Sequence, residues 1–145
     1  MDKKKKIYAL YGAHDTGKTT TLRALGQRMA AVAKPSRAIP VSGDFATQFV
    51  IKGVRVAIIS AGDSKMQITK GLDALNADGD FDILFCAART RGQTTDFLSS
   101  YFKGQTLRWI NHLYIEGNEQ DKVRACNESV ASFLYEILLL DLQME

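Results

Sequence analysis

The chain has 145 residues, of which 46% are hydrophobic and 24% are charged, a composition typical of one globular domain with a substantial core. No apolar run reaches the roughly 18 residues that span a bilayer, and the start lacks the apolar stretch of a secretory signal, so we expect a cytoplasmic protein without a membrane partner. The net charge of +3 argues little for a nucleic-acid partner, because four of the 19 basic residues form the run Lys3–Lys6 and one of the 16 acidic residues is Asp2, which leaves the rest of the chain neutral.

We expect a basic, disordered start over residues 1–6 and a single domain over residues 7–145. The apolar run Ile7–Tyr11 predicts a strand that stops at Gly12. Apolar residues at helical spacing then predict a helix over Gly17–Lys34, which Pro35 ends.

The middle of the chain predicts a hairpin and the centre of a sheet. Phe45–Ile51 and Val54–Ser60 have the pattern of two antiparallel strands joined at Lys52-Gly53. A helix is expected over Ser64–Asn76. The nearly unbroken apolar run Phe81–Ala88 then suits the centre of a parallel sheet, because such strands are buried on both faces.

The last third of the chain predicts two helices and one more strand. The helices are expected over Thr94–Phe102 and Glu119–Leu142. Helical spacing predicts that the second helix turns a stripe of apolar residues toward the core, namely Val123, Val130, Phe133, Leu134, Ile137 and Leu138. Between them, the alternation within Thr106–Ile115 predicts a strand with one well-buried face and with His112 exposed on the other. The two cysteines, Cys86 and Cys126, lack metal-type spacing and are expected to be small core residues.

One segment carries a phosphate-binding pattern, G-x-x-x-x-G-K-[ST]. Its residues are Gly12, Ala13, His14, Asp15, Thr16, Gly17, Lys18 and Thr19, and Thr20 follows them. The segment follows a predicted strand and opens a predicted helix, so backbone N–H groups and the positive helix end converge on one anion site. The pattern predicts that Lys18 reaches the β- and γ-phosphates of a nucleoside triphosphate and that the Thr19 hydroxyl serves Mg²⁺.

These residues make the chain resemble the P-loop NTPase superfamily over Ile7–Leu25. The hairpin over residues 48–62 resembles the second and third strands of small Ras-like GTPases, which end in an Asp-x-x-Gly motif. Gly62 matches the final glycine of that motif, but Ile59 stands where its Asp should be. The resemblance leaves Asp63, directly after Gly62, as the nearest carboxylate for Mg²⁺.

The guanine-reading motif of the same family, Asn-Lys-x-Asp, has no counterpart in this chain. Its place, after the central strand, is taken by residues 87–92, which contain Arg89 and Arg91 but no Asp. We therefore expect ATP over GTP, or no strong base preference. The two arginines are candidates for contacts with phosphate oxygens, because ligands bind outside the carboxyl ends of the strands in doubly wound sheets.

The sequence thus predicts a three-layer α/β P-loop NTPase fold, with a mostly parallel sheet of about five strands and one antiparallel edge hairpin. The expected function is ATP binding with Mg²⁺ and slow hydrolysis, in which Lys18, Arg89 and Arg91 act on the phosphates. Two alternatives stay open. One is a small-molecule or nucleotide kinase, and the other is a non-catalytic module that switches shape with nucleotide state through loops at Asp44 and Asp63. A protein partner or a homo-oligomer is compatible with either.

Overall fold

A computed structural model describes residues 4–12, 17–62, 64–89 and 93–143. Strands and helices follow one another along the chain in the order β1 (Lys6–Tyr11), α1 (Lys18–Ala30), β2 (Ala46–Ile51), β3 (Val54–Ile59), α2 (Lys65–Asp78), β4 (Ile83–Ala88), α3 (Gln93–Tyr101), β5 (Thr106–Asn111) and α4 (Gln120–Gln143). Among the described residues, no helix combines the length and the hydrophobicity needed to cross a membrane.

The five strands of the described chain form one sheet in the order β2-β3-β4-β1-β5. Neighbouring strands run parallel, except that β2 and β3 form an antiparallel pair. Lys52 and Gly53 both have positive φ at the tight turn between these two strands, as the favoured two-residue hairpin turns require. The prediction of a mostly parallel α/β sheet with one antiparallel edge pair is confirmed.

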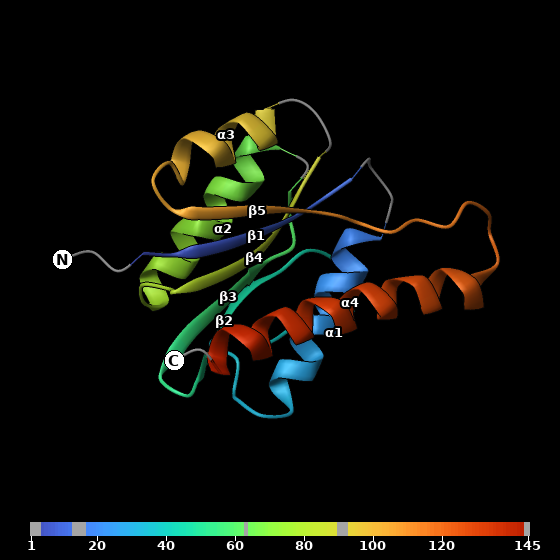
Figure 1. The fold of residues 1–145 in the computed structure, drawn as a ribbon, viewed down its shortest axis with the longest axis horizontal. Helices are drawn as coiled ribbons and strands as arrows, with labels where there is room; N and C mark the ends of the chain where they lie inside the picture. The colour runs from blue at the N-terminus through green and yellow to red at the C-terminus, as the bar shows by residue number, and fades with distance from the viewer. Residues whose placement is uncertain (1–3, 13–16, 63, 90–92, 144–145) are drawn as a thin grey trace.

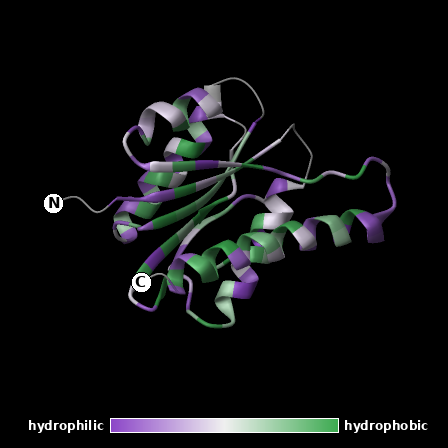
Figure 2. Ribbon diagram, viewed as in Figure 1, coloured by the Kyte–Doolittle hydropathy of each residue, from purple (hydrophilic) through white to green (hydrophobic). Residues whose placement is uncertain are grey.

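Helices cover both faces of the sheet (Figure 1). One hydrophobic core lies between the sheet and the pair α1 and α4, and a second lies between the sheet and the pair α2 and α3. All residues of β4 are buried, as expected of a strand at the centre of the sheet. Figure 2 shows hydrophobic residues along the central strands and a hydrophilic turn before α4.

The predicted burial of the segment Thr106–Ile115 is wrong. Within the described chain β5 pairs with β1 alone, and the two strands end together, since Tyr11 pairs with Asn111. No described strand lies beside the segment that follows, and Leu113 is 65% exposed. Trp109, within β5, is also exposed, because β5 is an edge strand.

Two boundaries and one predicted core position also differ from the structure. The helix α1 ends at Ala30 rather than Lys34. Backbone N–H groups just after it donate to the carbonyl oxygens of Arg28 and Met29 and close the last turn before Pro35. Lys5 and Lys6 belong to the fold rather than to a disordered start, because Lys6 begins β1 and its ammonium pairs with Asp141 on α4 at 3.2 Å. Phe133 was expected to face the core of α4 but is exposed, whereas a neighbouring stripe is buried as predicted, namely Val130, Leu134 and Leu138.

Candidate functional site

The carboxyl ends of β1, β3 and β4 meet at one edge of the sheet, next to the start of α1 (Figure 1). The backbone N–H of Gly12 donates to the carbonyl of Ala88 at 3.2 Å, which joins the end of β1 to the end of β4. Gly62 lies against the same strand end so closely that an added Cβ would come within 2.0 Å of the Ala87 carbonyl oxygen. A glycine is therefore required where the resemblance places the last residue of its Asp-x-x-Gly motif.

Lys18 is the first residue of α1, and it is buried, with 7% of its surface exposed. Its ammonium donates to the carbonyl oxygen of Gly12 at 2.7 Å, across the ends of the predicted phosphate loop. Gly17 precedes it with φ of 93°, a left-handed conformation that favours glycine. The two ends of the loop are thus held together by the residue that the pattern assigns to phosphate binding.

Several predicted site residues lie outside the described part of the chain. These are Ala13, His14, Asp15 and Thr16 of the phosphate loop, Asp63 of the predicted metal site, and Arg91. The described members of the predicted site are Gly12, Gly17, Lys18, Thr19, Thr20 and Arg89.

Thr19 has a carboxylate partner that the sequence reasoning did not assign to the metal. Its hydroxyl donates to Oδ1 of Asp44 at 3.1 Å, and the hydroxyl of Ser60, at the end of β3, lies 3.3 Å from the same oxygen. Asp44, Thr19 and Ser60 therefore place three oxygen-bearing side chains beside the start of α1. Hard cations such as Mg²⁺ prefer oxygen ligands, so this group fits the ion that the phosphate loop implies.

The antiparallel hairpin explains why Asp44 arrives at this position. β2 begins where β3 ends, so Asp44, two residues before β2, lies at the carboxyl edge of β3. The segment before Asp44 is held against α1 by Arg23, whose guanidinium donates to the carbonyl oxygens of Pro40 and Gly43 at 3.0 and 2.5 Å. The sequence signal was therefore present in the hairpin prediction, which fixes the start of one strand against the end of the other.

Ile59 stands at the Asp position of the resembled motif, and its side chain is part of the core. It is 1% exposed and packs in the hydrophobic cluster between the sheet and α2. Ile59 therefore supplies no carboxylate, and the carboxylate that contacts Thr19 is that of Asp44, from the segment before β2. Among the described residues, no three His, Cys, Asp or Glu side chains gather as a metal cluster, which is compatible with a cation held largely by phosphates and water.

His112 is buried, contrary to the prediction of an exposed strand residue. Its Nε2 lies 2.7 Å from Oγ1 of Thr21 on α1, and its Nδ1 contacts the carbonyl of Leu113. Burial lowers the pKa of His112, and the nearby positive charge of Lys18 lowers it further. The ring therefore supports α1 behind the phosphate loop as a neutral group rather than acting from the surface.

Asn127 on α4 closes the other side of the phosphate loop. Its side-chain amide packs so tightly on Gly17 that a Cβ there would lie 2.5 Å from Oδ1 of Asn127. Gly17, Thr20 and Asn127 also line a small cavity of about 160 Å³, whose remaining walls come from the segment after β5 and from α4. Cys126 lies on this cavity and is only partly buried, so the expectation that it is a core residue is wrong, whereas Cys86 is fully buried.

Arg89 lies at the carboxyl end of β4, as predicted, and is exposed. Its backbone N–H donates to the hydroxyl of Thr94 at 3.1 Å, which ties the end of β4 to the first turn of α3. The position leaves the Arg89 side chain at the same sheet edge as Gly12, because these two strand ends are bonded to each other through Ala88.

Comparison with protein-family models, with curated proteins and with solved structures found no match to this chain. The functional assignment therefore rests on the chemistry of the residues at this sheet edge.

Proposed function

We propose that the protein binds a nucleoside triphosphate together with Mg²⁺ at the start of α1 and hydrolyses it slowly. The observation that carries the proposal is the position of Lys18, a buried ammonium at a helix N-terminus whose bond to Gly12 spans the ends of a phosphate-loop sequence. Buried lysines are rare unless they have partners. A phosphate group bound in the loop would lie within reach of this ammonium.

The proposed roles follow from the residues around this lysine. The N-terminus of α1 and the ammonium of Lys18 attract phosphate oxygens. Thr19 and Asp44 would hold the Mg²⁺, which neutralises charge on the phosphates when it is bound. Arg89 is proposed to contact a phosphate and to bind it more strongly as negative charge develops on its oxygens during hydrolysis. Arg91 is proposed for the same role from the sequence alone.

The base is proposed to be adenine, or to be read weakly. Guanine recognition in the resembled GTPases uses an Asp after the central strand, and the described residue at the end of β4 is Arg89. The test is a thermal-shift panel with ATP, GTP, ADP and GDP, each with and without Mg²⁺, because a ligand that binds only the folded state raises its apparent stability. A melting temperature unchanged by every nucleotide would contradict the proposal, and a GTP affinity more than about tenfold tighter than that for ATP would contradict the base preference.

A nucleotide-dependent switch is the second candidate function, and the position of Asp44 favours it. Asp44 belongs to the segment between α1 and β2 and contacts Thr19 directly. A cation at Thr19 would change this contact and so bias the position of the whole segment. Single-turnover hydrolysis measured beside binding separates the two functions, because a switch module binds the triphosphate without appreciable turnover.

A further inference from the structure

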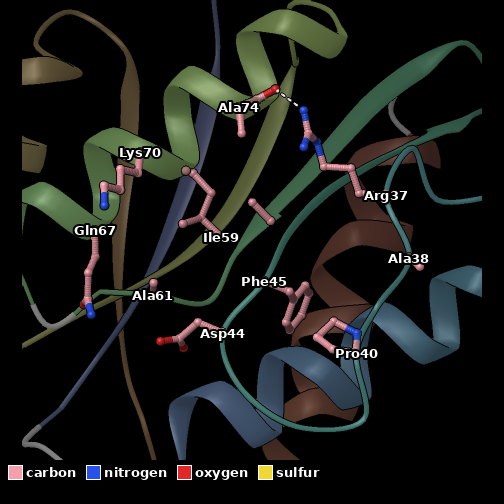
Figure 3. A pocket seen from close by; sticks show the side chains of 12 residues that line it. Arg37, Ala38, Pro40, Asp44, Phe45, Ile59, Ala61, Gln67, Lys70 and Ala74 are labelled. Carbon is pink, nitrogen blue, oxygen red and sulfur yellow. Dashed lines mark hydrogen bonds between the residues drawn. The ribbon is translucent and has the colours of Figure 1, made fainter.

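A second cavity lies beside Asp44, which is one of its lining residues. It has a volume of about 540 Å³ and opens between α2, the ends of β2 and β3, and the segment before β2 (Figure 3). None of the described phosphate-loop residues lines it. Its size falls within the roughly 300–1,000 Å³ typical of sites for small organic molecules.

The walls of this cavity are mainly apolar. Phe45 and Ile59 lie at the sheet side, Ala74 faces them from α2, and Pro40 comes from the segment before β2 (Figure 3). α2 approaches the sheet closely here, because a Cβ at Gly71 would lie 2.8 Å from a methyl carbon of Ile59. The cavity therefore has a fixed apolar wall rather than a wall of mobile polar side chains.

Two of the charged side chains around the cavity, Arg37 and Asp44, already have hydrogen-bond partners in the protein. The guanidinium of Arg37 is tied to α2, since its Nε donates to Asp78 at 2.9 Å and its Nη2 to the carbonyl of Ala74 at 3.2 Å. The carboxylate of Asp44 is engaged by the hydroxyls of Thr19 and Ser60.

Lys70 supplies the remaining charge. It is exposed on α2 at the rim of the cavity, and among the described residues its ammonium pairs with no acid. A cation at the mouth of an apolar cavity favours a ligand with an apolar body and an acidic group.

We propose that this cavity is a binding site for a small amphipathic anion, in which an aromatic or branched apolar body lies between Phe45 and Ala74 and an acidic group pairs with Lys70. The apolar area gives the ligand its affinity, and the lysine selects the anion over a neutral compound of the same shape. The site adjoins the nucleotide site, with which it shares Asp44, and it goes beyond the proposed function because none of the described phosphate-loop residues lines it.

The test uses two fluorescent probes with the same anilinonaphthalene body. One, 8-anilinonaphthalene-1-sulfonate, carries an acidic group, and the other, N-phenyl-1-naphthylamine, does not. Each is titrated against the wild-type protein without nucleotide and against three variants. Ala74→Leu fills the cavity from a helix position, Lys70→Gln removes the rim cation, and Lys103→Gln removes an exposed lysine elsewhere as the matched control.

We expect Ala74→Leu to weaken the binding of both probes by about tenfold or more, since it removes the apolar space that both occupy. Lys70→Gln should weaken only the sulfonate, by about threefold to fivefold, as fits an exposed ion pair. Lys103→Gln should change neither. Amide chemical shifts should move most at Ala61, Gly71 and Ala74 when the sulfonate is added.

Two results would overturn the proposal. Equal affinity of the sulfonate for wild type and Ala74→Leu would place its binding outside this cavity. Equal effects of Lys70→Gln and Lys103→Gln would mean that Lys70 does not select an anion. Lys70 is exposed, so its variant is expected to fold and keeps the test informative even where Ala74→Leu lowers stability.

Discussion

Replacing Gly17 with alanine measures two constraints that act at the start of α1. Gly17 has φ of +93°, and a Cβ added there would lie 2.5 Å from Oδ1 of Asn127. A residue with a side chain costs roughly 1–2 kcal/mol in this left-handed conformation. Moving the packed amide of Asn127 off its rotamer costs about 1 kcal/mol more. We therefore expect Gly17→Ala to lower the free energy of unfolding by about 2–3 kcal/mol, and the melting temperature by roughly 5–10 °C.

Gly104 offers a matched control for this substitution. It has a similar φ of +87°, but no atom lies within 4 Å of the position its Cβ would take. Gly104→Ala should therefore cost only the conformational part, about 1–2 kcal/mol. In an Asn127→Ala background the collision disappears, so Gly17→Ala should then cost the same as Gly104→Ala, with a coupling energy of about 1 kcal/mol.

Urea denaturation of the two single glycine variants, of Asn127→Ala and of the double variant Gly17→Ala/Asn127→Ala gives all of these free energies. If Gly17→Ala and Gly104→Ala lower the free energy of unfolding equally in the wild-type background, the packing of Asn127 on Gly17 has no energetic consequence. The reasoning would also be refuted if removing the Asn127 side chain left the cost of Gly17→Ala unchanged.

Three further predictions concern the charged and titrating groups of the site. Lys18→Ala should weaken triphosphate binding by about 10- to 100-fold in calorimetry while the protein stays folded, because hydrogen bonds to charged groups contribute roughly 1.5–3 kcal/mol; unchanged binding would contradict the assignment. Asp44→Asn should reduce the Mg²⁺ dependence of triphosphate binding severalfold, whereas Asp73→Asn, at an exposed position on α2, should leave it unchanged; equal effects of both would remove Asp44 from the metal site. Burial lowers the pKa of His112, so the unfolded chain takes up the proton first as the pH falls through about 6.5, and stability is lost below that pH. The urea midpoint should therefore drop more between pH 7.5 and pH 5.5 in the wild type than in His112→Asn, and equal drops would show that this ring does not titrate on unfolding.

The parts of the fold that the sequence predicted correctly are those with a strong local pattern. The hairpin follows from two short apolar strands around Lys52-Gly53, and the buried strand β4 follows from its unbroken apolar run. β5 has an alternating apolar pattern, but the burial of its side chains depends on neighbouring elements that the local pattern does not reveal. Among the described strands β5 pairs with β1 alone, at the edge of the sheet, and Trp109 is exposed in spite of its apolar side chain.

The candidate site shows the same limit. Lys18 and Thr19 are recognisable because the phosphate-loop pattern is contiguous in sequence. Asp44 contacts Thr19 from the segment before β2, and Asn127 packs on Gly17 from α4. Such contacts depend on tertiary pairing rather than on spacing. His112 was placed on the surface because its strand pattern was extended past the end of β1, where the chain in fact turns toward Thr21.

The packing of Asn127 on Gly17 also has a consequence for the order in which the protein is made. A ribosome synthesises the phosphate-loop segment first, yet the residue that packs against Gly17 lies on α4, which follows β5 much later in the sequence. β1 depends on the same helix, because the hydroxyl of Tyr8 donates to Asp141. Contacts between such distant parts of a sequence form late, since closing long loops costs chain entropy before the contacts stabilise anything. A nascent chain therefore exposes the apolar faces of β1 and α1 until α4 has left the ribosome, and truncations within α4 should accumulate as aggregates rather than as folded, nucleotide-free protein.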